Sequence, residues 1–167
     1  MVFSTASGSR MERLMATRTT DAAKDLYHAD LCLWARRQAM LLRARRFEDL
    51  DLDNLIEEVE GLADALESSV RSRAITIMVH LLKLQHSPAQ NPRIGWRETI
   101  RTQRTELLND LKPTLTRHLA DRLPQLYARA RHDAEGSLRD HGEESAADAL
   151  PKTCPYTLDQ ITGDWLP

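Results

Sequence analysis

The sequence predicts an all-α fold, a single helical bundle of four to five helices with an irregular C-terminal tail. Apolar residues recur in steps of three and four along most of the chain, which is the spacing of one helix face. Aromatic residues make up only 5% of the 167 residues, and the 6 glycines and 7 prolines are few. That composition disfavours a β-sandwich. We therefore expect residues 21–167 to form one helical domain, long enough to bury a core of its own.

Charge and cysteine content exclude several classes of protein. The formal net charge of −2 provides no overall attraction to nucleic acid or acidic membranes. Cys32 and Cys154 are far apart and form no CxxC pair, so neither a disulfide framework nor a zinc knuckle is indicated. We expect Cys32 to be a small core residue and the chain to be cytoplasmic. No apolar run approaches the ~20 residues of a membrane span, so we expect no membrane segment.

Residues 1–20 differ from the rest of the chain in composition. They are rich in Ser and Thr and contain three arginines against the single acid Glu12. A transit peptide has a similar composition, but an over-extended start or a loose tail is the simpler interpretation, with Met11 and Met15 as alternative starts. We expect residues 1–20 to be a disordered N-terminal tail.

A first helix is predicted from an N-cap at Thr20 or Asp21 to about Arg46, because apolar residues recur at helical spacing. Its end is basic and the following segment is acidic, so we expect the two runs to pair, although an arginine patch that binds phosphate is the alternative. The basic run is Arg36, Arg37, Arg43, Arg45 and Arg46, and the acidic run is Glu48, Asp49, Asp51, Asp53, Glu57, Glu58 and Glu60.

A central helix is predicted from Asp51 or Asp53 to His86, where Pro88 ends it. Its apolar residues form one stripe up to Leu66 and then cover more than half of the circumference between Val70 and Leu84. Such a wide apolar girdle must be covered on several sides, by the other helices or by a second chain. The segment Glu67-Ser68-Ser69 indicates either a kink or a break.

Two further helices and a short one follow. The third is predicted to begin near Gly95 and Trp96, and the fourth has Pro113 in its first turn and a kink, without a stop, at Pro124. Residues 133–148 are weakly patterned, so we expect a frayed helix end or a loop. Thr157 and Gln160 stand at capping-box spacing, which predicts a short helix ending at Gly163.

Four segments together resemble one bacterial family. They are WARRQAMLLRARRFEDLDLDNLIEEVEGL, HLLKLQHSPAQNPRIGWRETIRTQR, LPQLYARARHDA and a CPY segment with a terminal LP. In this order they resemble domain of unknown function family 29, over about residues 26–167. The resemblance implies an all-α fold and no established activity, so it transfers no catalytic residues. The recurring polar positions of the family match Gln38, Asn54, Glu57, Glu58, Glu60, His80, Lys83, Arg93, Trp96, Gln103 and Arg104 here.

Six of these polar residues form a candidate functional cluster: Glu57, Glu58, Glu60, His80, Lys83 and Arg104. We interpret them first as scaffolding. Isolated buried charge is costly, so Lys83 and Arg104 would neutralise the glutamates, and His80 would bond to a carboxylate or a carbonyl. The alternative is an active centre of a metal-dependent carboxylate and histidine enzyme.

Metal and hydrolase chemistry has little support in the sequence. A di-iron bundle needs two Glu-x-x-His pairs, and the nearest substitutes here are Asp25-x-x-His28 and His118-x-x-Asp121. There is also no G-x-S-x-G, no phosphate-binding glycine loop and no H-E-x-x-H. We expect no catalytic residue, no metal and no cofactor.

A basic ridge supports an alternative function in nucleic-acid binding. Arg93, Arg97, Arg101 and Arg104 recur by fours and threes beside Trp96, so the arginines could follow a phosphate backbone while the indole stacks on a base. Trp96 is equally suited to fill the core. We predict a noncatalytic module that associates with itself or with another protein, with nucleic-acid binding as the alternative.

Overall fold

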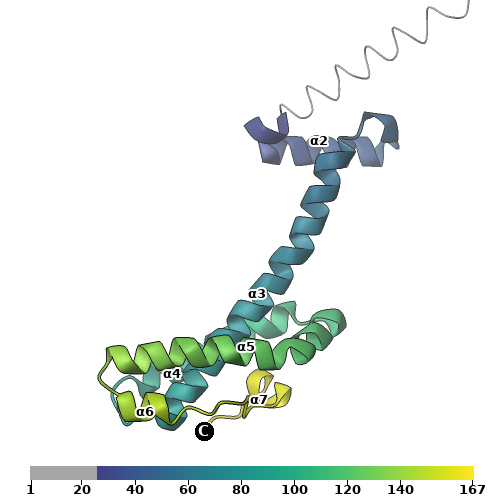
Figure 1. Ribbon diagram of the computed structural model, residues 1–167. Helices are drawn as coiled ribbons and strands as arrows, with labels where there is room; N and C mark the ends of the chain where they lie inside the picture. Colours follow the sequence, from purple (N-terminus) through teal and green to yellow (C-terminus); the bar gives the residue numbers. More distant parts are fainter. Residues whose placement is uncertain (1–25) are drawn as a thin grey trace, which may run out of the picture. The chain divides into compact units, whose positions relative to one another are not determined.

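The computed structural model describes residues 26–167 (Figure 1), and within that range every regular element is a helix. The all-α prediction is confirmed. The predicted tail 1–20 and the predicted helix start at Thr20 or Asp21 lie outside the described residues. The elements are α2 (Leu31–Arg43), the 3-10 helix η1 (Phe47–Asp49), α3 (Leu52–His86), α4 (Arg93–Asp110), α5 (Pro113–Asp140), α6 (Glu144–Asp148) and α7 (Leu158–Thr162).

The described part of the chain divides into two compact units, residues 26–63 and Asp64–Pro167, which we call unit one and unit two. The boundary lies within α3, so one helix contributes to both. The single domain over residues 21–167 stays a prediction.

Unit one contains α2, η1 and the first part of α3. The uninterrupted helix predicted up to Arg46 is wrong, because Asp30 leaves the helical conformation (φ −154°) and its carboxylate accepts the backbone N–H of Leu33 at 2.9 Å. A side chain that caps a helix in this way starts a new helix. At the other end α2 stops at Arg43, and Arg45 has a positive φ of 55°. The expectation for Cys32 is also wrong, since this residue is exposed.

The central helix is confirmed as α3, 35 residues long. It continues through Ser68 and Ser69 without a break and ends at His86, as predicted from Pro88. The serines are tolerated because the apolar spacing of the helix continues on both sides of them, and packing overrides their weak helix propensity.

The core of unit two forms around the second half of α3. Ile77, Met78, Leu81 and Leu82 are completely buried there, among apolar side chains of α4 and α5. The helices of this chain therefore cover the apolar girdle between Val70 and Leu84. That girdle does not require a second chain. The contributions from α4 and α5 are Ile100, Leu107, Leu119, Leu126, Tyr127, Ala130, Ala134 and Leu138.

The carboxyl-terminal half is more ordered than its pattern predicted. Helix α5 starts with Pro113 and continues through Pro124 to Asp140, and α6 follows after a turn at Gly142 (φ 74°). The frayed helix end or loop predicted for residues 133–148 is wrong except for the short turn between α5 and α6, because the sparse apolar residues of this segment, mostly alanines, are buried. The capping box of Thr157 and Gln160 is confirmed at the start of α7.

Candidate functional site

A buried polar network around Asp51, the residue before α3, connects the two helices of unit one. Asp51 is only 1% exposed. Its carboxylate Oδ2 accepts Trp34 Nε1–H of α2 at 3.1 Å and Asn54 Nδ2 at 2.7 Å, and its backbone N–H donates to Gln38 Oε1 at 3.0 Å. Paired buried polar groups of this kind fix how two helices meet. The family resemblance had singled out Gln38 and Asn54, whereas nothing in the sequence indicated that Trp34 and Asp51 would bond.

The three glutamates of the candidate cluster lie on the α3 segment of unit one. Glu58 Oε1 accepts the hydroxyl of Tyr27 at 2.7 Å, and this bond raises the pKa of Tyr27 to about 12. Among the contacts of residues 26–167, Glu57 and Glu60 form no hydrogen bond or ion pair, and both are exposed. Within unit one, the predicted pairing of basic and acidic runs is realised by Arg46 and Asp49 at 2.6 Å.

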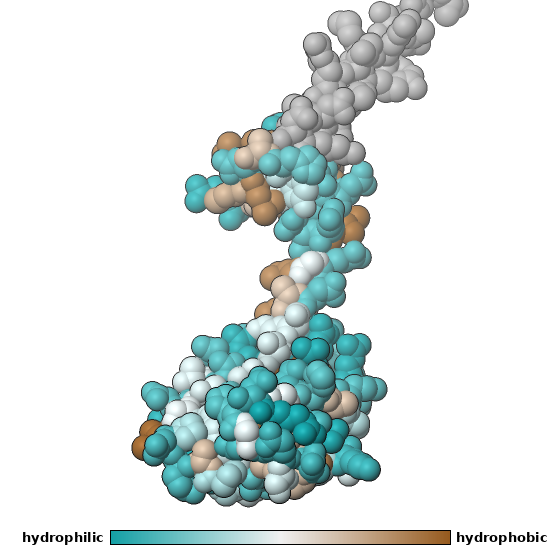
Figure 2. Space-filling model, turned by 60° about the vertical axis from the view of Figure 1, so that its left-hand side comes forward, coloured by the Kyte–Doolittle hydropathy of each residue, from teal (hydrophilic) through white to brown (hydrophobic). Residues whose placement is uncertain are grey.

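Many large apolar side chains are exposed in unit one. Figure 2 shows brown side chains at several places over α2 and the first part of α3, whereas the face of unit two in this view is mostly teal and white. Their exposed fractions range from 42% to 64%. We call this set the unit-one surface: Leu31, Leu33, Met40, Leu42, Phe47, Leu52, Ile56, Val59 and Leu62.

The other members of the candidate cluster lie in unit two and have partners there. His80 Nδ1 lies 2.9 Å from the carbonyl of Thr76, as predicted for a histidine bonded to a carbonyl, and burial lowers the pKa of His80. Lys83 Nζ donates to Ser137 Oγ at 2.9 Å and lies 4.9 Å from the centre of the Trp96 ring. Burial lowers the pKa of Lys83 as well. The ion pairs predicted between Lys83 and the glutamates are replaced by these contacts.

A small cavity adjoins Lys83. It measures about 130 Å³ and is bounded by Trp96, Ser137, His141 and Glu143. The negative charge of Glu143 partly offsets the effect of burial on the pKa of Lys83. The positive charge of Lys83 is thus stabilised by the Ser137 hydroxyl, the face of the Trp96 ring and the nearby Glu143 carboxylate.

Arg104 fastens the carboxyl-terminal segment to α4. Its Nε donates to the carbonyl of Ile161 at 3.0 Å, and its Nη2 donates to the carbonyls of Gln160 at 2.6 Å and Trp165 at 2.7 Å. The side chain is 7% exposed. The prediction that Arg104 pairs with the glutamates is therefore wrong. The five N–H donors of an arginine can bind backbone carbonyls as well as carboxylates. The spacing of residues in the sequence does not show which of these acceptors the folded chain brings close to the side chain.

The basic ridge on α4 is only partly exposed. Arg93 donates to the carbonyl of Leu84, in the last turn of α3, at 2.8 Å and to the carbonyl of Ser87, just after that helix, at 3.5 Å. Trp96 packs against the core and under Lys83. Arg97 and Arg101 are exposed and border a cavity of about 180 Å³ that also contains Asp164. Nucleic-acid binding stays a prediction, and Arg97 and Arg101 are the residues of the ridge that carry it.

The family model described as domain of unknown function DUF29 matches residues 26–166. The chain belongs to this family. No curated protein and no solved structure matches it. The resemblance read from the four motifs is confirmed, and membership brings no activity, ligand or partner to this DUF29 chain.

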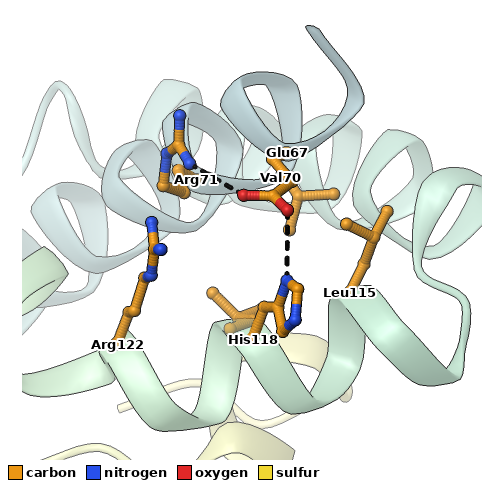
Figure 3. A pocket seen from close by; sticks show the side chains of 7 residues that line it. Glu67, Val70, Arg71, Leu115, His118 and Arg122 are labelled. Carbon is orange, nitrogen blue, oxygen red and sulfur yellow. Dashed lines mark hydrogen bonds and ion pairs between the residues drawn. The ribbon is translucent and has the colours of Figure 1, made fainter. Parts of the chain in front are cut away.

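A polar cluster that the sequence did not indicate joins α3 and α5 of the DUF29 chain. Figure 3 shows Glu67 between Arg71 and His118, with Glu67 Oε2 3.2 Å from Arg71 and Oε1 3.1 Å from His118 Nδ1. The hollow beside them encloses about 10 Å³, room for about one water molecule. We assign this cluster to helix packing.

Residues 26–167 of the DUF29 chain contain neither a metal-binding cluster nor a membrane-spanning helix. No three side chains of His, Cys, Asp or Glu gather there in a way that could hold a metal ion. No helix of that segment is both long and apolar enough to cross a bilayer.

Proposed function

We propose that this DUF29 chain is a noncatalytic, cytoplasmic bacterial module that binds another polypeptide through the unit-one surface. The observation that carries the proposal is the density of exposed apolar side chains. Unit one has nine large ones in the 38 residues 26–63, whereas unit two has five in 104 residues. Single exposed apolar residues are ordinary, but so many of them on one short segment indicate an interaction surface.

The energetics favour binding. Burial of apolar surface contributes roughly 25 cal/mol per Å² removed from water, so several half-exposed Leu, Ile and Met side chains provide a substantial driving force. Part of that driving force is lost to immobilisation of the partners. The helices that expose these side chains are held together by the buried Asp51 network, so the surface is preorganised for a partner.

The polar residues support a noncatalytic reading. Two residues of the candidate cluster, His80 and Arg104, bond to backbone carbonyls, and Lys83 bonds to a hydroxyl and an aromatic ring. These groups hold helices and the carboxyl-terminal segment in place. A cytoplasmic location fits the two cysteines, which are unpaired.

Site-specific photo-crosslinking tests the proposal. We would place p-benzoylphenylalanine at Val59 in the full chain, irradiate cells of the native host and look for a covalent adduct with a polypeptide. The matched control carries the same amino acid at Glu98, an exposed position on α4 in unit two. We expect an adduct at Val59 and none at Glu98. Absence of an adduct at Val59, or equal labelling at both positions, would overturn the proposal.

A further inference from the structure

We infer that the polypeptide bound by the unit-one surface is a second copy of this chain. In the pair, α2 of each copy lies on the first part of α3 in the other copy. This inference rests on the proposed function and adds the identity of the partner and the pairing of the helices. Three features of unit one carry it: charge, spacing and the faces that each helix leaves open.

The two helices of unit one carry opposite charge. Helix α2 contains Arg36, Arg37 and Arg43 and no acidic residue. Residues 51–63 contain five acidic residues and no basic one. Among the contacts of residues 26–167, the three arginines and the exposed Glu57 and Glu60 form no side-chain hydrogen bond or ion pair. Unit one therefore presents a basic and an acidic surface at once, each with charge available to a partner.

The apolar residues on the two helices have matching spacing. Leu33 and Met40 on α2 are seven residues apart, and so are Leu52 and Val59 on α3, with Ile56 between them. Seven residues are two helical turns, about 10.5 Å along the axis. Two helices whose exposed apolar residues stand seven residues apart can pack side by side, with charged residues bordering the contact. At 100° per residue, Arg36 and Arg43 border the stripe of α2, and Glu60 borders the stripe of α3.

Each helix has one face occupied within the chain and another face open. On α2, Trp34 and Gln38 contact the start of α3, whereas Leu33 and Met40 lie roughly 130° away around the helix, at 100° per residue. On α3, Asn54 and Glu58 lie on the side bonded to Asp51 and Tyr27, and the stripe from Leu52 to Val59 lies a similar angle away. A helix with two such faces fits a four-helix bundle, in which every helix contacts two neighbours.

Charge selects α2 on α3 over the other pairings. Contact between two α3 segments would bring two acidic helices together, with Glu60 of each copy beside the contact, and contact between two α2 helices would bring Arg36 and Arg43 of each copy together. Like charges in contact are unfavourable. A two-fold pair with α2 on α3 instead repeats one favourable contact twice and alternates basic and acidic helices around the bundle.

Charge reversal with rescue tests the pairing. We would measure the dissociation constant of the full chain by sedimentation velocity for the wild type and three variants. Arg36→Glu with Arg43→Glu, and Glu57→Arg with Glu60→Arg, should each raise the constant at least tenfold, whereas all four changes together should restore it to within threefold. The control is Arg97→Glu with Arg101→Glu, the same charge change on exposed arginines of unit two. It should leave the constant unchanged.

The outcomes separate this inference from the proposed function. A wild-type chain that stays monomeric at tens of micromolar would overturn the inference, and so would a dimer that ignores both charge reversals or is not restored by the combination. The adduct formed at Val59 supplies the distinction. An adduct of twice the chain mass supports the second copy, whereas an adduct with a different protein overturns the second copy and leaves the proposed function standing. Circular dichroism checks that each exposed-site variant keeps its helix content.

Discussion

The two ends of α3 both have apolar residues at helical spacing, as a narrow stripe in the first part and a wide girdle in the second, and their surroundings differ. Leu52, Ile56 and Val59 in the first part are more than half exposed, whereas Ile77 and Leu81 in the second part are completely buried. In unit two, α4 and α5 supply the apolar side chains that cover the helix. In unit one, α2 bonds to Asp51 at the start of α3, on a side of that helix away from the stripe. One helix thus provides both the core of one unit and the exposed surface of the other.

The comparison shows that apolar periodicity identifies a face and leaves open what covers it. From the sequence, the wide girdle between Val70 and Leu84 looked like the place that would need a partner. In the structure the girdle is covered within the chain, whereas the narrower stripe between Leu52 and Leu62 is exposed.

Truncations at the two ends of α3 provide the sharpest test of this difference. Leu81→Ala should lower the free energy of unfolding by about 2–5 kcal/mol, since the buried side chain leaves a cavity. Ile56→Ala should change it by about 0.5 kcal/mol or less at concentrations where the chain is monomeric. Urea unfolding monitored by circular dichroism measures both. Equal losses at the two positions would mean that the first part of α3 is as well covered as the second.

The next largest effect is expected at Arg104, which lies in unit two. Arg104→Met keeps an unbranched side chain but removes the donors for three backbone carbonyls, so we expect a loss of about 2 kcal/mol. Amide exchange around Ile161 should rise at the same time. Arg101→Met is the control, because Arg101 is exposed one turn away on α4. A stable, protected carboxyl-terminal segment in Arg104→Met would show that these hydrogen bonds are dispensable.

A smaller effect is expected for the polar network of unit one. Trp34→Phe retains an aromatic ring and removes the indole N–H that Asp51 accepts, which should cost about 1 kcal/mol. The change should appear as faster amide exchange in α2, with exchange in α5 unaffected. Cys32→Ser, at an exposed position of the same helix, provides the comparison. Uniform exchange changes in both units would contradict a local role for this bond.

The smallest effect is the pH dependence contributed by His80. Burial holds the pKa of His80 below its ordinary value of 6.5, so the folded chain binds a proton less readily than the unfolded chain. The stability contributed by the neutral ring is present above pH 6.5 and is lost as pH falls through 6.5 toward the folded-state pKa. Urea midpoints at pH 7 and pH 5 should therefore differ less in His80→Gln than in the wild type. An unchanged difference would assign the pH dependence to other groups, such as His86, whose pKa burial also lowers.

Much of the local structure could be predicted because its causes are local. The ends of α3, the start of α5 at Pro113 and the capping box at Thr157 follow from residues within one or two turns. The break at Asp30 was missed because an aspartate can cap a helix or sit on its exposed face, and the choice depends on how the neighbouring helix packs. The partners of Lys83 and Arg104 were also missed, since those partners lie 54 and 56 to 61 residues further along the chain.

The sequence by itself determined that this protein is helical, where its long central helix runs and which family it belongs to, since periodicity and motifs can be read residue by residue. Only the tertiary structure decided that the second part of α3 is covered while the stripe from Leu52 to Leu62 stays exposed, and that Arg104 holds the carboxyl-terminal segment. Burial depends on which distant segments reach a given helix face, and the spacing of residues along that face is the same whether or not they do.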